Sequence, residues 1–375
     1  MLLWAFLFAF LIFASGGCLF FLIYNVRRFR LVSKLSRGRR AAGWGIGIAL
    51  ILLPAAAAWR LLGFMNAVTI LLHLSIFWML AALVQHLAEK RRGQPLRRYY
   101  AGALAVLFTA VYLGVGAYQA YHVWQTDYTV PTSKPVGSLR VALLADSHVG
   151  TTFDGDGLRP HLQRIQAQNP DMVVIAGDFV DEDSTKENML AACRALGELE
   201  TPYGVYFAFG NHDKGLYSNG SRGYTGDDLI AALEENGVTV LQDQIADIDG
   251  RFALIGRQDA SEETDFGGSR ADIRQLAQQA GDDRFTIVLD HQPRDYAAEA
   301  EAGVDLVLSG HTHGGQLIPL MQFIRWFHLS GEDQVYGQEC RGGTNFIVTS
   351  GISDWAIKFK TGCISEFVIV DIVGQ

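Results

Sequence analysis

Side chains of the types that bind metal ions recur in five short turns of this sequence. The turns read Asp146-Ser147-His148, Gly177-Asp178-Phe179-Val180-Asp181, Gly210-Asn211-His212-Asp213, Asp290-His291-Gln292-Pro293 and Gly310-His311-Thr312-His313-Gly314-Gly315-Gln316. One such turn alone could be a helix cap or a surface loop. Five of them in order, holding five of the seven histidines found after residue 136, indicate a common site.

The donor types of these turns suit a hard or borderline metal. Nitrogen and oxygen ligands without cysteine are typical of manganese, iron or zinc. Two such ions about 3.5–4 Å apart can clamp the attacking and leaving oxygens of a phosphoryl group. A pair of ions that shares a bridging carboxylate needs about seven side chains, and the five turns supply that number. The sequence therefore predicts a dinuclear metal site suited to phosphoester hydrolysis.

Each turn follows a short apolar run that reads as a buried strand. The runs that precede the turns cover residues 139–145, 172–176, 205–209, 285–289 and 304–308, and further runs cover 252–255, 346–349 and 367–372. Helical patterns lie between them at 158–168, 187–199, 227–235, 270–279 and 295–301. Alternating strands and helices predict an α/β domain. Because ligands bind at the carboxyl ends of strands in open α/β sheets, the five turns should converge.

The order of the motifs resembles that of the calcineurin-like metallophosphoesterases. The matching motifs are D-x-H, G-D-x-x-D, G-N-H-D, a single histidine and G-H-T-H-G-G-Q. The long last motif looks like that of the bacterial subgroup whose catalytic domain is membrane-attached or exported. The resemblance covers about residues 138–375 and does not cover the segment before them. It implies a two-sheet β-sandwich flanked by helices, with the site at one edge of the sandwich.

The resemblance also implies a role for each residue of the site. The ligands would be Asp146, His148 and His313 for a first ion, Asn211, His291 and His311 for a second, and Asp178 as the bridge between them. His212 is similar to the acid that protonates the leaving oxygen, and Asp181 to the carboxylate that orients its imidazole. A helix-capping role for Asp181 is an equal alternative. For Asp213 and Lys214, capping or solvation is favoured over contact with substrate.

The first 136 residues have a different composition from the rest of the chain. They contain 14 Lys and Arg against 2 Asp and Glu, whereas the remainder contains 17 against 37. Four stretches without any of these residues cover 1–26, 41–59, 61–88 and 99–126, and each reaches the roughly 20 residues that cross a bilayer. We therefore predict an all-α transmembrane domain of four helices over 1–124, a linker over 125–137 and a catalytic domain over 138–375.

Charge sets the expected orientation and the expected partners. The loops at 27–40 and 90–98 are rich in arginine and should stay in the cytoplasm, which places the catalytic domain outside the cytoplasmic membrane. Membrane lipids are therefore expected partners. The net −20 after residue 136, from 17 cationic and 37 anionic residues, disfavours nucleic acid as a substrate.

We thus expect a metal-dependent phosphoesterase that hydrolyses a phosphomonoester, a phosphodiester or a lipid-linked pyrophosphate. One alternative is a metal-loaded but slow sensor of phosphorylated ligands, and another is a cytoplasm-facing pyrophosphohydrolase of lipid A synthesis. The presence of all seven ligands together with His212 favours the enzyme, and the charge of the loops opposes the cytoplasmic alternative. The natural substrate and the oligomeric state stay open.

Two further features concern residues beyond the turns. The segment 320–329 would form a helix that is apolar over most of its circumference, either packed in the core or acting as a flap that reaches the membrane. Cys340 and Cys363 would both lie outside the cytoplasm, where a disulfide can persist. Their separation does not follow from the sequence, so their pairing is an open question.

Overall fold

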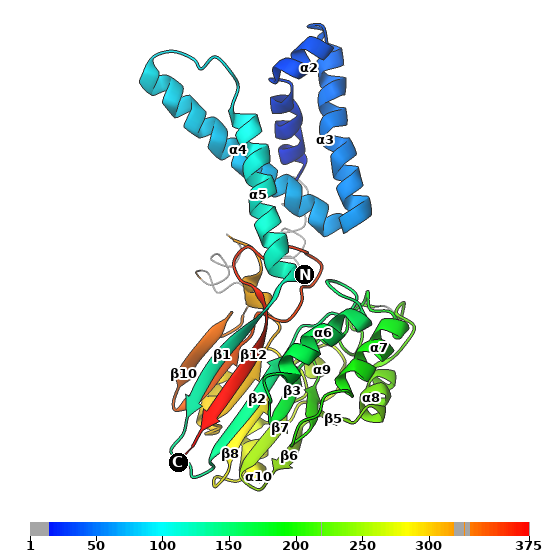
Figure 1. The fold of residues 1–375 in the computed structure, drawn as a ribbon, viewed down its shortest axis with the longest axis vertical. Helices are drawn as coiled ribbons and strands as arrows, with labels where there is room; N and C mark the ends of the chain where they lie inside the picture. The colour runs from blue at the N-terminus through cyan, green and yellow to red at the C-terminus, as the bar shows by residue number, and fades with distance from the viewer. Residues whose placement is uncertain (1–14, 219, 319–325, 327–330, 375) are drawn as a thin grey trace. The chain divides into compact units, whose positions relative to one another are not determined.

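The computed structural model describes residues 15–218, 220–318, 326 and 331–374 of the chain. The chain forms two compact units (Figure 1). The first comprises Met1–Ala117 with the short segment Ala356–Lys358, and the second comprises Tyr118–Trp355 with Phe359–Gln375.

The first unit is helical. After the apolar helix Ser15–Val26 come α2 (Arg30–Leu35), α3 (Arg40–Leu62), α4 (Phe64–Arg92) and α5 (Ala101–Tyr121). Within the described residues, three helices are long and apolar enough to cross a membrane, namely α3, α4 and α5. The first of the four predicted spans is described only from Ser15 onward. The prediction of four spans therefore rests in part on residues outside the described range.

Glycines end the first two of these long helices. Gly63 follows α3 with φ 93°, and Gly93 follows α4 with φ 69°, which is a backbone conformation that residues with a Cβ adopt at a cost. A polar chain joins α4, the loop before α5 and the helix Ser15–Val26. Trp78 Nε1 donates to the Tyr99 hydroxyl at 2.6 Å, which in turn donates to Asn25 Oδ1 at 3.1 Å. Such bonds satisfy polar atoms that lipid could not.

The second unit contains two mixed six-stranded sheets. The first sheet has the order β1 (Val123–Pro131), β12 (Ser365–Val373), β2 (Ser138–Leu144), β3 (Met172–Ala176), β4 (Val205–Ala208) and β5 (Val238–Leu241). The second has the order β10 (Gly337–Arg341), β11 (Thr344–Val348), β9 (Leu306–Ser309), β8 (Phe285–Leu289), β7 (Phe252–Gly256) and β6 (Gln244–Ile248). Strands β2 to β5 are parallel, as are β11, β9, β8 and β7.

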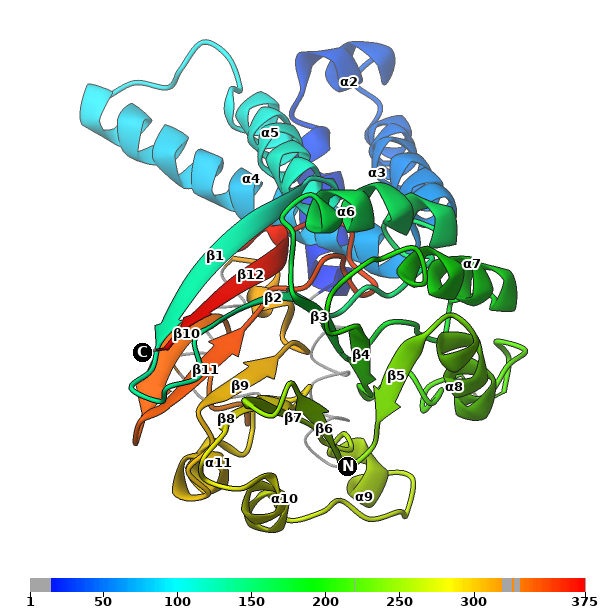
Figure 2. The same cartoon turned by 60° about the horizontal axis from the view of Figure 1, so that its bottom comes forward.

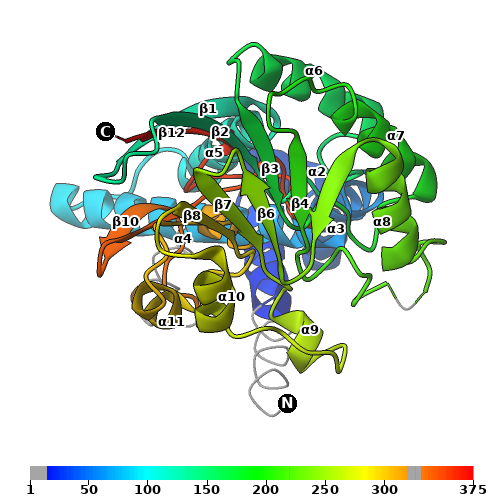
Figure 3. The same cartoon turned by 90° about the horizontal axis from the view of Figure 1, so that it is seen from below.

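The two sheets face each other and carry helices on their outer sides (Figures 2 and 3). Helices α6 (Gly155–Gln166), α7 (Lys186–Leu196) and α8 (Gly226–Glu235) lie on the first sheet, and α10 (Ile273–Ala280) and α11 (Tyr296–Glu301) on the second. The short α9 (Ser261–Thr264) follows β7. Three apolar cores separate these layers, one between the sheets and one under each helical layer. The expected two-sheet α/β architecture is confirmed.

Burial explains why the central strands could be read from the sequence. Every residue of β3, β7, β8 and β9 is buried, so these strands are continuous apolar runs, as parallel strands covered on both faces must be. The edge strands β1, β6 and β10 expose much of their length and have mixed composition. The sequence did not indicate these three strands, nor β5.

The segment expected to be a linker differs in the structure. Residues 123–131 form β1, which pairs in parallel with β12 along its whole length. Its polar residues, such as Gln125 and Asp127, read as a linker because most of this strand is exposed to solvent. Only the residues after Pro131 fall between regular elements on the way to β2.

Two other expectations concern single residues. Cys340 is exposed in β10, whereas Cys363 is buried with its thiol donating to the His313 carbonyl at 3.1 Å, and both are free thiols. The considered disulfide is therefore absent. Of the segment 320–329, only Trp326 is described, so the flap hypothesis lies outside the described residues.

Candidate metal centre

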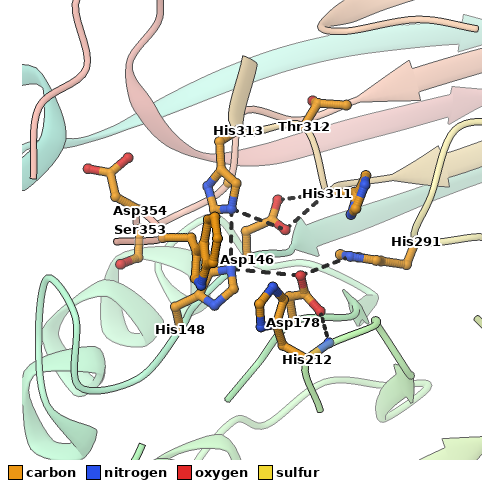
Figure 4. A network of polar contacts seen from close by, with 12 residues as sticks. Asp146, His148, Asp178, His212, His291, His311, Thr312, His313, Ser353 and Asp354 are labelled. Carbon is orange, nitrogen blue, oxygen red and sulfur yellow. Dashed lines mark hydrogen bonds and ion pairs between the residues drawn. The ribbon is translucent and has the colours of Figure 1, made fainter. Parts of the chain in front are cut away.

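The five turns converge at the carboxyl ends of strands from both sheets (Figure 4). Asp146 and His148 follow β2, Asp178 follows β3, Asn211 and His212 follow β4, His291 follows β8, and His311 and His313 follow β9. All of these side chains are buried except that of His311, which is partly exposed. The sandwich edge thus collects the residues that the sequence singled out, with Asp181 also buried beside them.

The first group of ligand-type atoms consists of Asp146, His148 and His313, which lie within 4.8 Å of one another. The Nε2 atoms of His148 and His313 are 3.2 Å apart, and His313 Nε2 is 3.9 Å from Asp146 Oδ1. Two imidazole nitrogens that face each other at this distance inside a buried site need a shared proton or cation between them. The group coincides with the set expected for a first ion.

The second group consists of Asp178, His291 and His311, again within 4.8 Å. His291 Nε2 lies 3.0 Å from Asp178 Oδ2, and the same oxygen lies 3.8 Å from His148 Nε2 in the first group. One carboxylate oxygen of Asp178 therefore faces both groups. This is the position that a bridging ligand must occupy.

Asn211 supplies a test of whether the site fits metal ions. Its Oδ1 is buried and has no hydrogen-bond partner among the described residues. A buried oxygen without a partner costs about 1–3 kcal/mol, and a cation would satisfy it. His291 shows the matching arrangement, because its Nδ1 is 2.7 Å from the Ala176 carbonyl and its Nε2 therefore presents a lone pair to the site. The donors present fit a pair of divalent ions.

The electrostatics of the cluster point the same way. Burial disfavours a charged His148, but the carboxylates of Asp181 and Asp178 outweigh burial and raise its pKa to about 9. Burial alone would raise the pKa of Asp178, yet the imidazoles around it hold that pKa well below its usual value. The buried carboxylates thus favour positive charge in the space between the two groups, which is the charge that metal ions supply.

Backbone strain is concentrated in the same turns. Of the eleven non-glycine residues with positive φ among the described residues, six lie in these turns, namely Asp146 at 55°, His148 at 37°, Asp178 at 52°, His311 at 72°, His313 at 48° and Gln316 at 52°. Each such residue costs on the order of 1 kcal/mol, and this strain is typical of sites that position functional groups. Close approach of the turns adds to it. A Cβ on Gly177 would lie 2.5 Å from the Gly210 nitrogen, so the two turns meet only because both residues lack a side chain.

Asp213 holds two of these turns together. Its buried carboxylate accepts hydrogen bonds from the backbone nitrogens of Asp178, Phe179, Val180 and Gly210 at 2.7–3.1 Å. Burial, with the negative charge of Asp178, raises the pKa of Asp213 to about 6. Asp213 is therefore neither solvated nor a helix cap as expected, and instead it ties the turn after β3 to the turn after β4.

The expected partner of His212 is different in the structure. Asp181 lies against His148, with Oδ2 3.2 Å from His148 Nδ1, rather than against His212. The carboxylate that contacts His212 is Glu182, whose Oε2 is 2.8 Å from His212 Nδ1. Because successive residues of the turn point to different sides, Asp181 contacts His148 and the next residue, Glu182, contacts His212.

Sequence reasoning missed three residues around His212. They are Glu182, Tyr217 and Trp355, of which the last two have rings 4.9 Å and 5.3 Å from the His212 ring. The acidic run Asp181-Glu182-Asp183 was the available signal for Glu182. Tyr217 and Trp355 lie outside the five turns, and no motif around them indicated a place in the site.

Comparisons with known proteins agree with this site. Residues 139–315 match the family model described as calcineurin-like phosphoesterase. An uncharacterized metallophosphoesterase from Campylobacter jejuni is 27% identical over 311 residues, covering 81% of this chain and 79% of that protein. An uncharacterized metallophosphoesterase from Aquifex aeolicus is 28% identical over 272 residues, covering 72% of this chain and 99% of that protein. Coverage of 81% exceeds what residues 138–375 could supply, so similarity reaches into the helices.

A transmembrane protein with metallophosphoesterase domain from Danio rerio is also similar. It is 30% identical over 230 residues, which cover 58% of this chain and 51% of that protein, so the chain spans about half of its length. The second unit thus contains a region that matches the calcineurin-like phosphoesterase family and is similar to these metallophosphoesterases, which supports a phosphoester hydrolase. Three apolar helices and a transmembrane relative indicate that the protein associates with a membrane.

Proposed function

We propose that the protein is a membrane-anchored phosphoesterase with a dinuclear metal centre, of the bacterial subgroup that carries the G-H-T-H-G-G-Q motif. One observation carries the proposal, namely that Asp178 Oδ2 faces both groups of buried ligand atoms. Asp146, His148 and His313 would hold one ion. Asn211, His291 and His311 would hold the other.

The reaction proposed is hydrolysis of a phosphoester. When bound, two divalent ions of manganese, iron or zinc would neutralise the phosphoryl oxygens and lower the pKa of a water molecule. A water oxygen would attack phosphorus in line with the leaving oxygen, whose bond to phosphorus would break, and the attacking water would release one proton to solvent. Glu182 accepts a hydrogen bond from His212 Nδ1, so His212 Nε2 is the nitrogen that donates a proton to the leaving oxygen. The products are an alcohol and the phosphate that remains.

Substitution of His212 tests the proposal against a metal-loaded sensor. The purified full-length protein should hydrolyse chromogenic phosphomonoesters or phosphodiesters after loading with Mn²⁺, Fe²⁺ or Zn²⁺. His212→Ala should keep its metal content and lose about 10²–10⁴-fold in kcat, the usual worth of a general acid. A wild-type protein that binds metal and turns over none of these esters would instead support the sensor. Loss of metal from His212→Ala would contradict the acid role.

We also propose that the second unit lies outside the cytoplasm. The support is the contrast between the loop after Ser15–Val26 and the loop after α4, which are rich in Arg and Lys, and the loop between α3 and α4, which is not. That placement favours substrates at the outer membrane surface, including lipid-linked phosphates. A periplasmic enzyme reporter fused after Gln375 should be active, and a reporter active only in the cytoplasm would contradict the proposal.

A further inference from the structure

The imidazole of His212 is held by residues from three separate segments. Glu182 in the turn after β3 accepts from Nδ1 at 2.8 Å, and the rings of Tyr217 and Trp355 lie 4.9 Å and 5.3 Å from the imidazole. Trp355 comes from the chain between β11 and β12. Both aromatic residues are partly exposed to solvent, Tyr217 by 53% and Trp355 by 40%. An imidazole so enclosed has one nitrogen left for the substrate.

Glu182 is itself held on its other side. Its Oε1 accepts a hydrogen bond from the indole Nε1–H of Trp355 at 3.1 Å, while Oε2 serves His212. Partial burial alone would raise the pKa of Glu182, but the hydrogen bonds from His212 and Trp355 outweigh it and lower that pKa. Both oxygens of an ionised carboxylate are thus engaged by N–H donors.

We infer that Glu182 is the positioning residue of His212 and that Trp355 locks Glu182 in place for that role. The inference rests on the proposed function of His212 as the acid. A carboxylate at Nδ1 fixes the tautomer and the rotation of the ring, so that Nε2 is aimed at the leaving oxygen. Asp181, one residue earlier, does the corresponding work for the metal ligand His148. Two adjacent carboxylates therefore serve two histidines with different tasks.

The hydrogen-bond arithmetic of glutamine makes the inference testable. In Glu182→Gln, one carboxylate oxygen becomes an NH₂ group, which has donors only. While Nδ1 is protonated, either His212 Nδ1–H or Trp355 Nε1–H must then face another donor. If Nδ1 instead accepts from the NH₂ group, the ring can no longer be the imidazolium form that acts as the acid. Trp355→Phe keeps an aromatic ring beside His212 but removes the indole donor. In the double variant, the glutamine oxygen can turn to His212 while its NH₂ group meets no opposing donor.

The experiment measures kcat on two substrates whose leaving groups differ in their need for a proton. A 4-nitrophenyl ester leaves readily without one, whereas an alkyl ester requires it. On the alkyl ester, Glu182→Gln should lose about 10–100-fold, as supporting partners of catalytic groups do. The loss on the 4-nitrophenyl ester should be at least about tenfold smaller. On the alkyl ester, kcat of the double variant should be at least about threefold higher than that of Glu182→Gln, because the indole N–H that would face the glutamine NH₂ group has been removed.

Controls separate positioning from structure. Asp183→Asn removes a neighbouring exposed carboxylate and should keep wild-type rates on both esters. Metal content should be the same in all variants. Equal losses of Glu182→Gln on the two esters, or a double variant slower than either single variant, would overturn the inference. A wild-type protein without metal-dependent turnover would instead overturn the proposed function, so the two failures are distinguishable.

Discussion

Two largely buried clusters of charged residues lie next to each other in the second unit, and they differ in how their charges are satisfied. In the first, which we call the paired cluster, Arg257 and Arg270 form ion pairs with Asp290, Asp295 and Glu299. The second is the metal centre described above. The clusters touch in sequence, since Asp290 is followed directly by His291. The two clusters therefore meet at the end of the same strand, but their negative charges are balanced in different ways.

The paired cluster supplies its own counter-charges. Arg257 lies 2.8 Å from Asp290, 2.9 Å from Asp295 and 3.4 Å from Glu299. Burial by itself would lower the pKa of Arg257, but these carboxylates outweigh it and raise that pKa. In the metal centre, among the described residues, only histidines form ion pairs with Asp146 and Asp178. No guanidinium or ammonium group meets those carboxylates in the described part of the chain.

The difference teaches how to tell a structural cluster from a binding site. In the paired cluster, each carboxylate has a guanidinium partner, although Arg257 Nε and Asp290 Oδ1 lack hydrogen-bond partners among the described residues, and its loss should lower stability. A buried cluster with facing imidazoles and an unpartnered Asn211 oxygen is complete only with something added. Breaking the first should change folding, and breaking the second should change binding.

Arg257→Met should show the larger effect on folding. Removal of one partner leaves Asp290 and Glu299 with less compensation, and breaking a buried ion pair costs about 3–5 kcal/mol. For a unit of this size the melting temperature should fall by roughly 10 °C. Metal content per folded molecule should not change. Arg274→Gln, which removes an exposed pair with Glu301, is the matched control and should move the melting temperature little.

Asp181→Asn should show the opposite pattern and a smaller effect. Asp181 lies 3.2 Å from Nδ1 of His148 and loses its charge without a change in shape. Partners of metal-bound histidines are worth about 10–100-fold in affinity, so metal binding should weaken by that factor. The melting temperature of the metal-free protein should fall less than in Arg257→Met. If metal titration gave the wild-type affinity, the link between Asp181 and the metal centre would be refuted.

The sequence predicted the central strands and the convergence of the five turns because both follow from burial. Strand β3, for example, is apolar throughout and is followed directly by Gly177 and Asp178. Ends of parallel strands meet at one edge, so the residues after them meet as well. The sequence did not predict edge strands such as β1, because their exposed positions carry polar residues that are also typical of a linker.

The partner of His212 could not be read from the motif. Asp181 and Glu182 are adjacent carboxylates, and which of them meets which histidine depends on backbone angles in the turn rather than on residue types. Glu182 is also selected by Trp355, which lies 173 positions away in the chain. Trp355 lies in the chain between β11 and β12, so the contact depends on how two distant segments pack. It leaves no periodic or local trace in the sequence.

The metal content of the purified full-length protein tests the central claim most directly. Elemental analysis of the wild type, after loading with Mn²⁺, Fe²⁺ or Zn²⁺ and removal of free ions, should give two ions per chain, the number that a bridged pair requires. Asp178→Asn, which loses the charge between the two groups, should retain little or no metal under the same conditions. One ion in the wild type, or two ions retained by Asp178→Asn, would contradict a dinuclear centre bridged by Asp178.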